Sequence, residues 1–71
     1  METIEISTPF IRLDAFLKFA AVTGSGGEAK LIIQDGMVSV NGEVCTARGK
    51  KLRAGDTVSV GGGVFLIEGP A

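Results

Sequence analysis

The stretch SGGEAKLIIQDGMVSVNGE, residues 25–43, decides the fold because it holds a helix with both of its boundaries, followed by a strand and a turn. Ser25 and Glu28 have the spacing of a capping box, in which the Ser side chain accepts a backbone N–H and the Glu side chain reaches back to the Ser N–H. A helix is therefore predicted from about Gly26 to Gln34. Gly36 ends it, because glycine readily adopts the left-handed conformation that follows a helical cap. The residues expected to face inward are Ala29, Ile32 and Ile33.

The second half of the same stretch has the pattern of a β-hairpin. Val38 and Val40 alternate with Ser39, as in a strand with one buried face. Asn41-Gly42 is the strongest short hairpin signal, because a type I′ turn needs positive φ at both central residues. The return strand is predicted at Val44–Thr46.

Upstream, the apolar spacing indicates another helix over about residues 12–21. Its apolar positions follow i, i+3, i+4, i+7 and i+8 and are occupied by Leu13, Phe16, Leu17, Ala20 and Ala21. The connector Thr23–Gly27 would join the two helices into an αα-hairpin. Before them, Thr3–Ile6 alternates polar and apolar residues and is predicted as a short strand.

Downstream, turns and short strands follow one another. Ala54-Gly55-Asp56 is a turn, and Thr57–Val60 and Val64–Ile67 form a hairpin across three glycines. The last of these strands is expected in the core, with a partner surface as the alternative. The fold class is therefore α+β, an N-terminal αα-hairpin packed on a small twisted antiparallel sheet, in one domain over residues 1–71.

Composition excludes several functions. The 71 residues contain no His and a single Cys, which excludes a His-based triad, a His metal site and an intrachain disulfide. Cys45 lies in an apolar strand pattern and is expected to be a small buried residue in a reducing, cytoplasmic setting. No apolar run is long enough to span a membrane. We expect a non-enzymatic binding module without metal, cofactor or small-molecule substrate, because no set of acid, base and nucleophile is present.

The charges are unevenly distributed along a chain whose net charge is −1. All seven basic residues lie between positions 12 and 53, and residues 7–60 carry seven bases against five acids, a net charge of +2. Four bases, with no acid among them, fall within the six residues Arg48–Arg53. Such a patch can hold phosphates, although a solvated surface loop is the alternative interpretation. Arg12 is expected to pair with Asp14 or Glu43 instead and is left out of the site.

The start of the second helix is a candidate phosphate site, because its first N–H groups are unpaired and the helix dipole is positive there. Gly26 and Gly27 would let a phosphate approach the backbone, with Lys30 one turn further on; ordinary capping is the alternative. Scarce aromatic residues favour structured RNA over single strands as a ligand. Asn41 can serve turn geometry alone.

Five motifs in this order resemble a known RNA-binding domain: Ile11–Lys18, Ser25–Lys30, Gly36–Glu43, Arg48–Arg53 and Ala54–Val58. The chain resembles the domain named after small-subunit ribosomal protein S-four, the alpha-L motif, over about residues 6–61. It is most similar to the small stand-alone bacterial members, the YaaA/YbcJ-like proteins. Many members carry Arg where this chain has Gly26 and Lys30, although Gly at the first position agrees with the stand-alone group.

The resemblance implies a cytoplasmic, monomeric module that binds structured RNA, such as ribosomal RNA, ribosomal particles or a ribosome assembly intermediate. It places RNA along the second helix and the neighbouring loops. The residues it implicates are Lys18, Ser25, Gly26, Gly27, Lys30, Gln34, Asn41, Arg48, Lys50, Lys51 and Arg53. The alternative is a protein-interaction adaptor of the same fold that has lost RNA binding.

Overall fold

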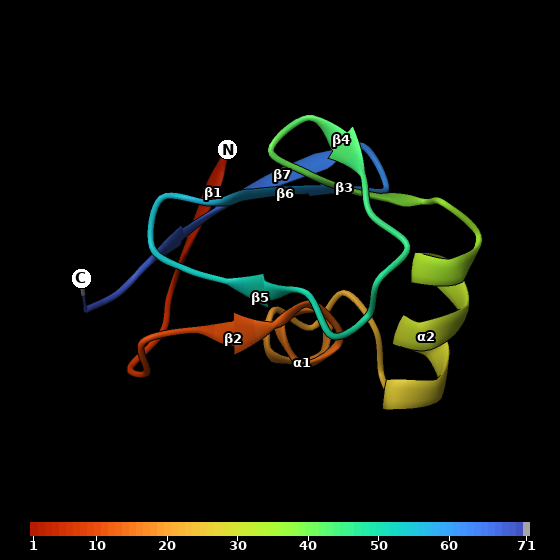
Figure 1. The fold of residues 1–71 in the computed structure, drawn as a ribbon, viewed down its shortest axis with the longest axis horizontal. Helices are drawn as coiled ribbons and strands as arrows, with labels where there is room; N and C mark the ends of the chain where they lie inside the picture. The colour runs from red at the N-terminus through yellow and green to blue at the C-terminus, as the bar shows by residue number, and fades with distance from the viewer. Residues whose placement is uncertain (71) are drawn as a thin grey trace.

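Two short helices lie on one side of a five-stranded sheet in the computed structural model, which describes residues 1–70 (Figure 1). The α+β class is thus confirmed. The helical hairpin is not N-terminal, however, because two strands precede it. The elements are β1 (Glu2–Glu5), β2 (Ile11–Arg12), α1 (Leu13–Phe19), α2 (Gly26–Gln34), β3 (Val38–Val40), β4 (Glu43–Val44), β5 (Lys51–Leu52), β6 (Thr57–Val60) and β7 (Gly63–Glu68). Across the described residues, neither helix has the length and apolar character that crossing a membrane requires.

The large sheet has the strand order β1-β7-β6-β3-β4, and it is mixed rather than antiparallel. The first and last strands of the chain pair in parallel, with Ile4 beside Ile67, whereas the other pairs are antiparallel. The antiparallel prediction was therefore wrong at β1. Local alternation identifies a strand but carries no information about which distant strand it joins or in which direction.

A second, two-stranded sheet was not predicted. β2 and β5 pair antiparallel, with Ile11 opposite Leu52 and Arg12 opposite Lys51. The expected loop at residues 48–53 is thus partly a strand. The expected helix at residues 12–21 is shorter, because Arg12 is extended (φ −74°, ψ 150°) and Ala20 forms the cap at the other end.

Helix α1 begins without a capping side chain. The Leu13 N–H donates instead to the Lys50 carbonyl at 2.9 Å, and the Asp14 N–H donates to the Arg48 carbonyl at 3.1 Å. These are two of the N–H groups that have no partner within a helix. The basic stretch therefore supplies the acceptors that the first turn of α1 needs.

Helix α1 ends in a Schellman arrangement with alanine at the left-handed position. The Val22 N–H donates to Leu17 O at 2.9 Å, and the Ala21 N–H donates to Lys18 O at 3.0 Å. Ala21 has φ 60°. Helix α2 ends in the same way at Gly36 (φ 75°), as predicted, but with a residue that adopts this conformation without strain.

The start of α2 and the turn after β3 both follow the sequence prediction. The Ser25 hydroxyl accepts the Glu28 N–H at 3.2 Å, although the reciprocal bond of a capping box is not formed among residues 1–70. Asn41 and Gly42 both have positive φ, 51° and 86°, as a type I′ turn requires. The return strand β4 covers residues 43–44 rather than 44–46.

The core lies between the large sheet and the helices. Phe16 of α1 meets Phe65 of β7 edge-to-face, with ring centroids 5.9 Å apart. Ile67 is fully buried, whereas Val64 is exposed and Leu66 is half-buried, so alternate residues of β7 face the core and the solvent. The buried apolar residues are Ile6, Leu13, Phe16, Leu17, Ala29, Ile33, Val38, Val40, Leu52, Val58 and Ile67.

A polar network joins the β3–β4 turn to the turn before β6. The Asn41 side-chain amide donates to Asp56 Oδ1 at 3.1 Å, and its carbonyl oxygen accepts the Thr57 N–H at 2.9 Å. Asp56 Oδ2 accepts the Arg53 N–H at 2.8 Å. Asp56 thereby fixes the end of the basic stretch to the large sheet.

Replacing Ala21 by Gly should raise the free energy of unfolding by about 0.5–1 kcal/mol, because glycine tolerates positive φ without the penalty that an L side chain pays there. Chemical denaturation measures this change. Ala20→Gly is the matched control, because Ala20 has φ −82°; it should lower stability by a similar amount. Destabilisation by both substitutions would contradict the assignment of strain to Ala21.

Asp56→Ala should lower the free energy of unfolding by about 1–3 kcal/mol, because the Arg53 N–H and the Asn41 amide both lose an acceptor. Asp35→Ala is the control, since Asp35 is an exposed acid whose side chain has no hydrogen-bond partner within residues 1–70. Its effect should stay within about 0.5 kcal/mol. Equal effects of the two substitutions would show that the network adds no stability.

Candidate nucleic-acid interface

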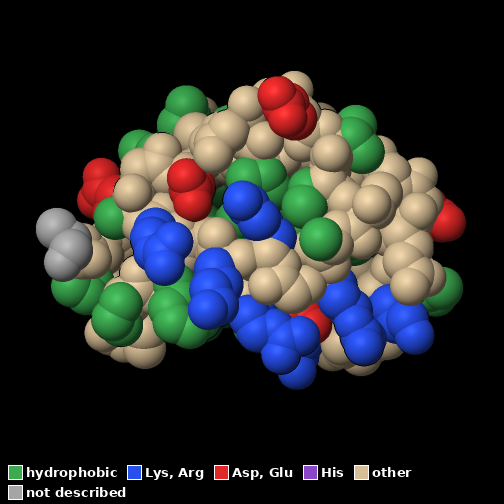
Figure 2. All heavy atoms as spheres, viewed as in Figure 1, with side chains coloured by type: hydrophobic (Ala, Val, Ile, Leu, Met, Phe, Trp, Pro, Cys, Tyr) green, Lys and Arg blue, Asp and Glu red, His purple; other side chains and the backbone are tan. Residues whose placement is uncertain are grey.

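Many Lys and Arg side chains are visible together on one face of the molecule (Figure 2). In Figure 2 the Lys and Arg side chains form a band along the part of the view where Figure 1 shows β5, β2, α1 and α2. We call this band the basic face. The Lys and Arg residues of the chain, from which this band is drawn, are Arg12, Lys18, Lys30, Arg48, Lys50, Lys51 and Arg53.

The basic stretch is held in place by its backbone and by one apolar anchor. Leu52 is fully buried, whereas its neighbours Lys51 and Arg53 are exposed. The carbonyls of Arg48 and Lys50 accept hydrogen bonds from the start of α1. The backbone is thus tied to the core while the side chains of all four bases stay exposed.

Two cations lie directly opposite each other in the small sheet, and each has a separate partner. Arg12 and Lys51 are register partners, an arrangement in which like charges destabilise a sheet. Arg12 Nη2 lies 3.5 Å from Asp14 Oδ2, as the first of its two expected pairings, and this is the single ion pair among residues 1–70. Lys51 Nζ lies 4.9 Å from the Phe10 ring centroid, a cation–π contact.

Phe10 was missed by the sequence analysis. Phe10 is 38% exposed, and its ring lies against the charged end of Lys51. The available signal was an aromatic residue outside both the strand alternation and the helical stripe. It adds one aromatic surface to a face that otherwise offers charge and amides.

A shallow groove of about 210 Å³ runs between α1 and the start of α2, lined by Arg12, Asp14, Ala15, Lys18 and Gly26. A Cβ built on Gly26 would lie 4.0 Å from Lys18 Cδ, and one on Gly27 would lie 4.0 Å from Ser25 Oγ. These are ordinary contacts, and neither glycine has positive φ. Nothing in the fold therefore requires glycine at the first two positions of α2, where alanine would favour the helix more.

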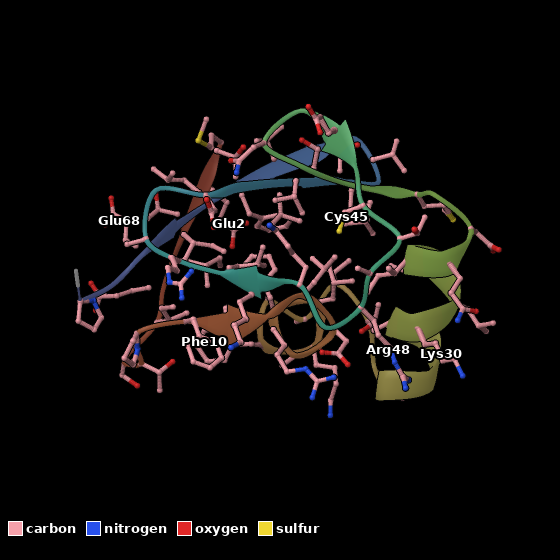
Figure 3. All side chains as sticks on the ribbon, in the orientation of Figure 1. Glu2, Phe10, Lys30, Cys45, Arg48 and Glu68 are labelled. Atoms are coloured by element: carbon pink, nitrogen blue, oxygen red, sulfur yellow. The ribbon has the colours of Figure 1, made fainter. Side chains whose placement is uncertain are left out.

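Helix α2 presents Lys30 and Gln34 to solvent. Figure 3 shows the Lys30 and Arg48 side chains both extending toward the lower edge of the view, on the side of the basic face. Leu31 on the same helix is 61% exposed and was not singled out from the sequence. The outer side of α2 thus combines a cation, an amide and an apolar side chain.

Two expected site residues have structural roles. The Ser25 hydroxyl caps α2, and both polar groups of the Asn41 side chain bond within the network at Asp56 and Thr57. The structure does not bring Asn41 to α2. Instead it lines a groove of about 370 Å³ with Val40, Glu43, Val44, Cys45 and Lys50.

The remaining chemistry-bearing groups form no centre among residues 1–70. No group of three or more Cys, Asp or Glu side chains lies close enough there to hold a metal ion. Cys45 is half-buried against the core, and its Sγ lies 3.7 Å from the Ala47 carbonyl oxygen (Figure 3). The arrangement suits the binding of an anion more than chemical catalysis.

Known proteins similar to this chain match most of its length. The chain is 46% identical over 65 residues to the "Probable ribosome maturation protein RlbA" of Bacillus subtilis, covering 90% of this chain and 92% of that protein. It is 41% identical over 54 residues to the "Putative RNA-binding protein YbcJ" of Escherichia coli, covering 76% and 77% of the two chains. The S4 domain family matches residues 4–68. This chain therefore belongs to the S4 domain family.

Proposed function

We propose that this protein is a non-enzymatic module that binds structured RNA through the basic face. The observation that supports the proposal is the band of Lys and Arg side chains in Figure 2, on a chain whose net charge is −1. With one ion pair formed among residues 1–70, most of these cations remain available to phosphates. A local patch on a near-neutral protein attracts polyanions without making the whole surface adhesive.

The start of α2 adds backbone donors to this face. The N–H groups of Gly26 and Gly27 belong to the first turn, where the helix dipole is positive. Since the fold does not require glycine here, close approach of a phosphate to the backbone explains the pair better than packing does. Lys18 and Lys30 flank that position and would contact the same strand of phosphates.

The remaining expected residues divide into contacts and supports. We assign direct contact to Gln34, Arg48, Lys50, Lys51 and Arg53, which are all exposed. Ser25 and Asn41 act by holding α2 and the β3–β4 turn in position. An RNA duplex is read mainly through phosphates and 2′-hydroxyls, which suits cations and amides better than deep base pockets.

The relatives' names suggest where such an RNA is found. One relative is named for ribosome maturation and another for RNA binding. We therefore propose ribosomal RNA or a ribosome assembly intermediate in the cytoplasm as the target. A flat response to salt would instead support the protein-interaction adaptor.

The first test is titration with a structured ribosomal RNA fragment and a single-stranded control between about 50 and 200 mM salt. With three or four phosphates neutralised, log K against log salt should have a slope of about −2 to −4 for the folded RNA. Lys50→Gln with Lys51→Gln should reduce the steepness of that slope by about 1–2.

The matched control is Thr3→Glu with Val64→Glu, two exposed positions in strands β1 and β7 of the large sheet. It changes the net charge by the same amount but lies outside the basic face. A similar loss of affinity in both double variants would show that net charge, rather than this face, governs binding.

A second test concerns the glycines of α2. Gly26→Ala with Gly27→Ala should raise stability slightly, since alanine favours the helix, while weakening RNA binding several-fold because the added methyls block close approach. Thermal unfolding and RNA titration on one preparation separate the two effects. Unchanged RNA affinity would remove the α2 backbone from the interface.

A further inference from the structure

The large sheet has an outer face and an outer edge that no other element of the described chain covers. Figure 1 shows both helices and the small sheet on one side of it. The strand register gives the residues of the opposite side. Ser39 lies beside Ser59, which lies beside Val64. Leu66 lies between Thr57 and Thr3. This face is therefore made of small polar and aliphatic side chains.

The charges of the large sheet are all negative. Its five strands contain no Lys or Arg, and their charged residues are Glu2, Glu5, Glu43 and Glu68. Glu5 and Glu68 are register partners, and neither forms an ion pair among residues 1–70. Neighbouring like charges destabilise a sheet, so an added cation here would relieve repulsion as well as form contacts.

The edge strand β1 has free backbone groups. The Ile6 N–H donates to the Glu68 carbonyl at 2.7 Å, so Ile6 and, by alternation, Ile4 direct their backbone groups toward β7. Thr3 and Glu5 then direct theirs away from the sheet. β1 is the outermost strand, and such an edge accepts an extended peptide by strand addition.

A groove adjoins this edge where β1 leaves the sheet. It encloses about 560 Å³ and combines apolar walls, which include Ile6, Leu66 and Pro70, with the two acids Glu5 and Glu68 at the same site. A Lys or Arg side chain matches it, because its aliphatic stem can lie on apolar surface while its charged end meets carboxylates.

We propose that β1 and the adjoining groove bind an extended, Lys- or Arg-rich segment of a protein partner. The segment adds a strand beside Thr3 and Glu5 and places a cationic side chain between Glu5 and Glu68. The groove adjoins the end of the basic stretch, since Ala54 and Gly55 line it, but its own charged residues Glu5 and Glu68 are acidic. RNA and a basic protein segment would therefore contact different side chains. The inference does not depend on RNA binding.

A second copy of the chain is a poorer occupant. An antiparallel pair of β1 strands would bring together Glu2 and Glu5 of both copies and supply no cation. Like charges gathered in this way are destabilising. The charge pattern therefore selects a basic partner over self-association.

The test uses a short blocked peptide of alternating Lys and Val, titrated into the isotope-labelled full chain without RNA. Amide shifts should concentrate on β1, on β7 and on residues 54–55, and should spare α2. Glu5→Gln with Glu68→Gln should weaken binding about five- to tenfold, as expected for two surface ion pairs. The variant should be at least as stable as the parent, because the repulsion between the two carboxylates is removed.

The control variant is Glu28→Gln with Asp35→Asn, which makes an equal charge change on α2 and its cap. It should bind like the parent. A peptide N-methylated at alternate residues has the same charge but cannot pair with a strand edge, and it should bind far more weakly. Equal loss in both variants, equal binding of the methylated peptide, or self-association of the free chain through β1 would each overturn the proposal.

Discussion

The first turn of α1 depends on carbonyl groups from a segment more than thirty residues further along the chain. A helix start leaves N–H groups that need acceptors, and here no side chain caps them. The Arg48 and Lys50 carbonyls satisfy two of these groups. These two hydrogen bonds hold the basic stretch against the start of α1, next to the point where β2 pairs with β5.

Neighbouring cations in the basic face repel one another. Arg12 lies opposite Lys51 in the small sheet, and repulsion between them must be offset elsewhere. Asp14 and Phe10 each accommodate one of these cations, and burial of Leu52 adds an apolar contribution of about 1.5–3 kcal/mol. Such a surface is suited to a polyanionic ligand, because bound phosphates would offset the repulsion between the cations.

The features that could be predicted from the sequence are those that depend on residues close together in the chain. Ser25, Gly36 and Asn41-Gly42 act within a few residues, and the structure confirms the boundaries and the turn that they indicate. The β2–β5 pair and the parallel β1–β7 pair join distant segments through backbone groups, which local patterns do not encode.

The candidate site likewise combines features that the sequence shows with features that only the tertiary fold shows. The cations are visible from composition, and their convergence was suggested by the family resemblance rather than by spacing. That the Asn41 side chain bonds to Asp56 and Thr57, and that Lys51 stacks on Phe10, depended on the tertiary fold. The absence of any steric need for Gly26 also required the position of Lys18 to be known.

The parallel contact between β1 and β7 closes the chain on itself, since it joins residues 2–5 to residues 65–68. During synthesis, the first strand must wait until almost the whole described chain has left the ribosome before its partner exists. In that interval Ile4 and Ile6 lack the neighbours that later shield them, and contacts of such long sequence separation form slowly. The large sheet can therefore be completed only after the last strand has been synthesised and has left the ribosome.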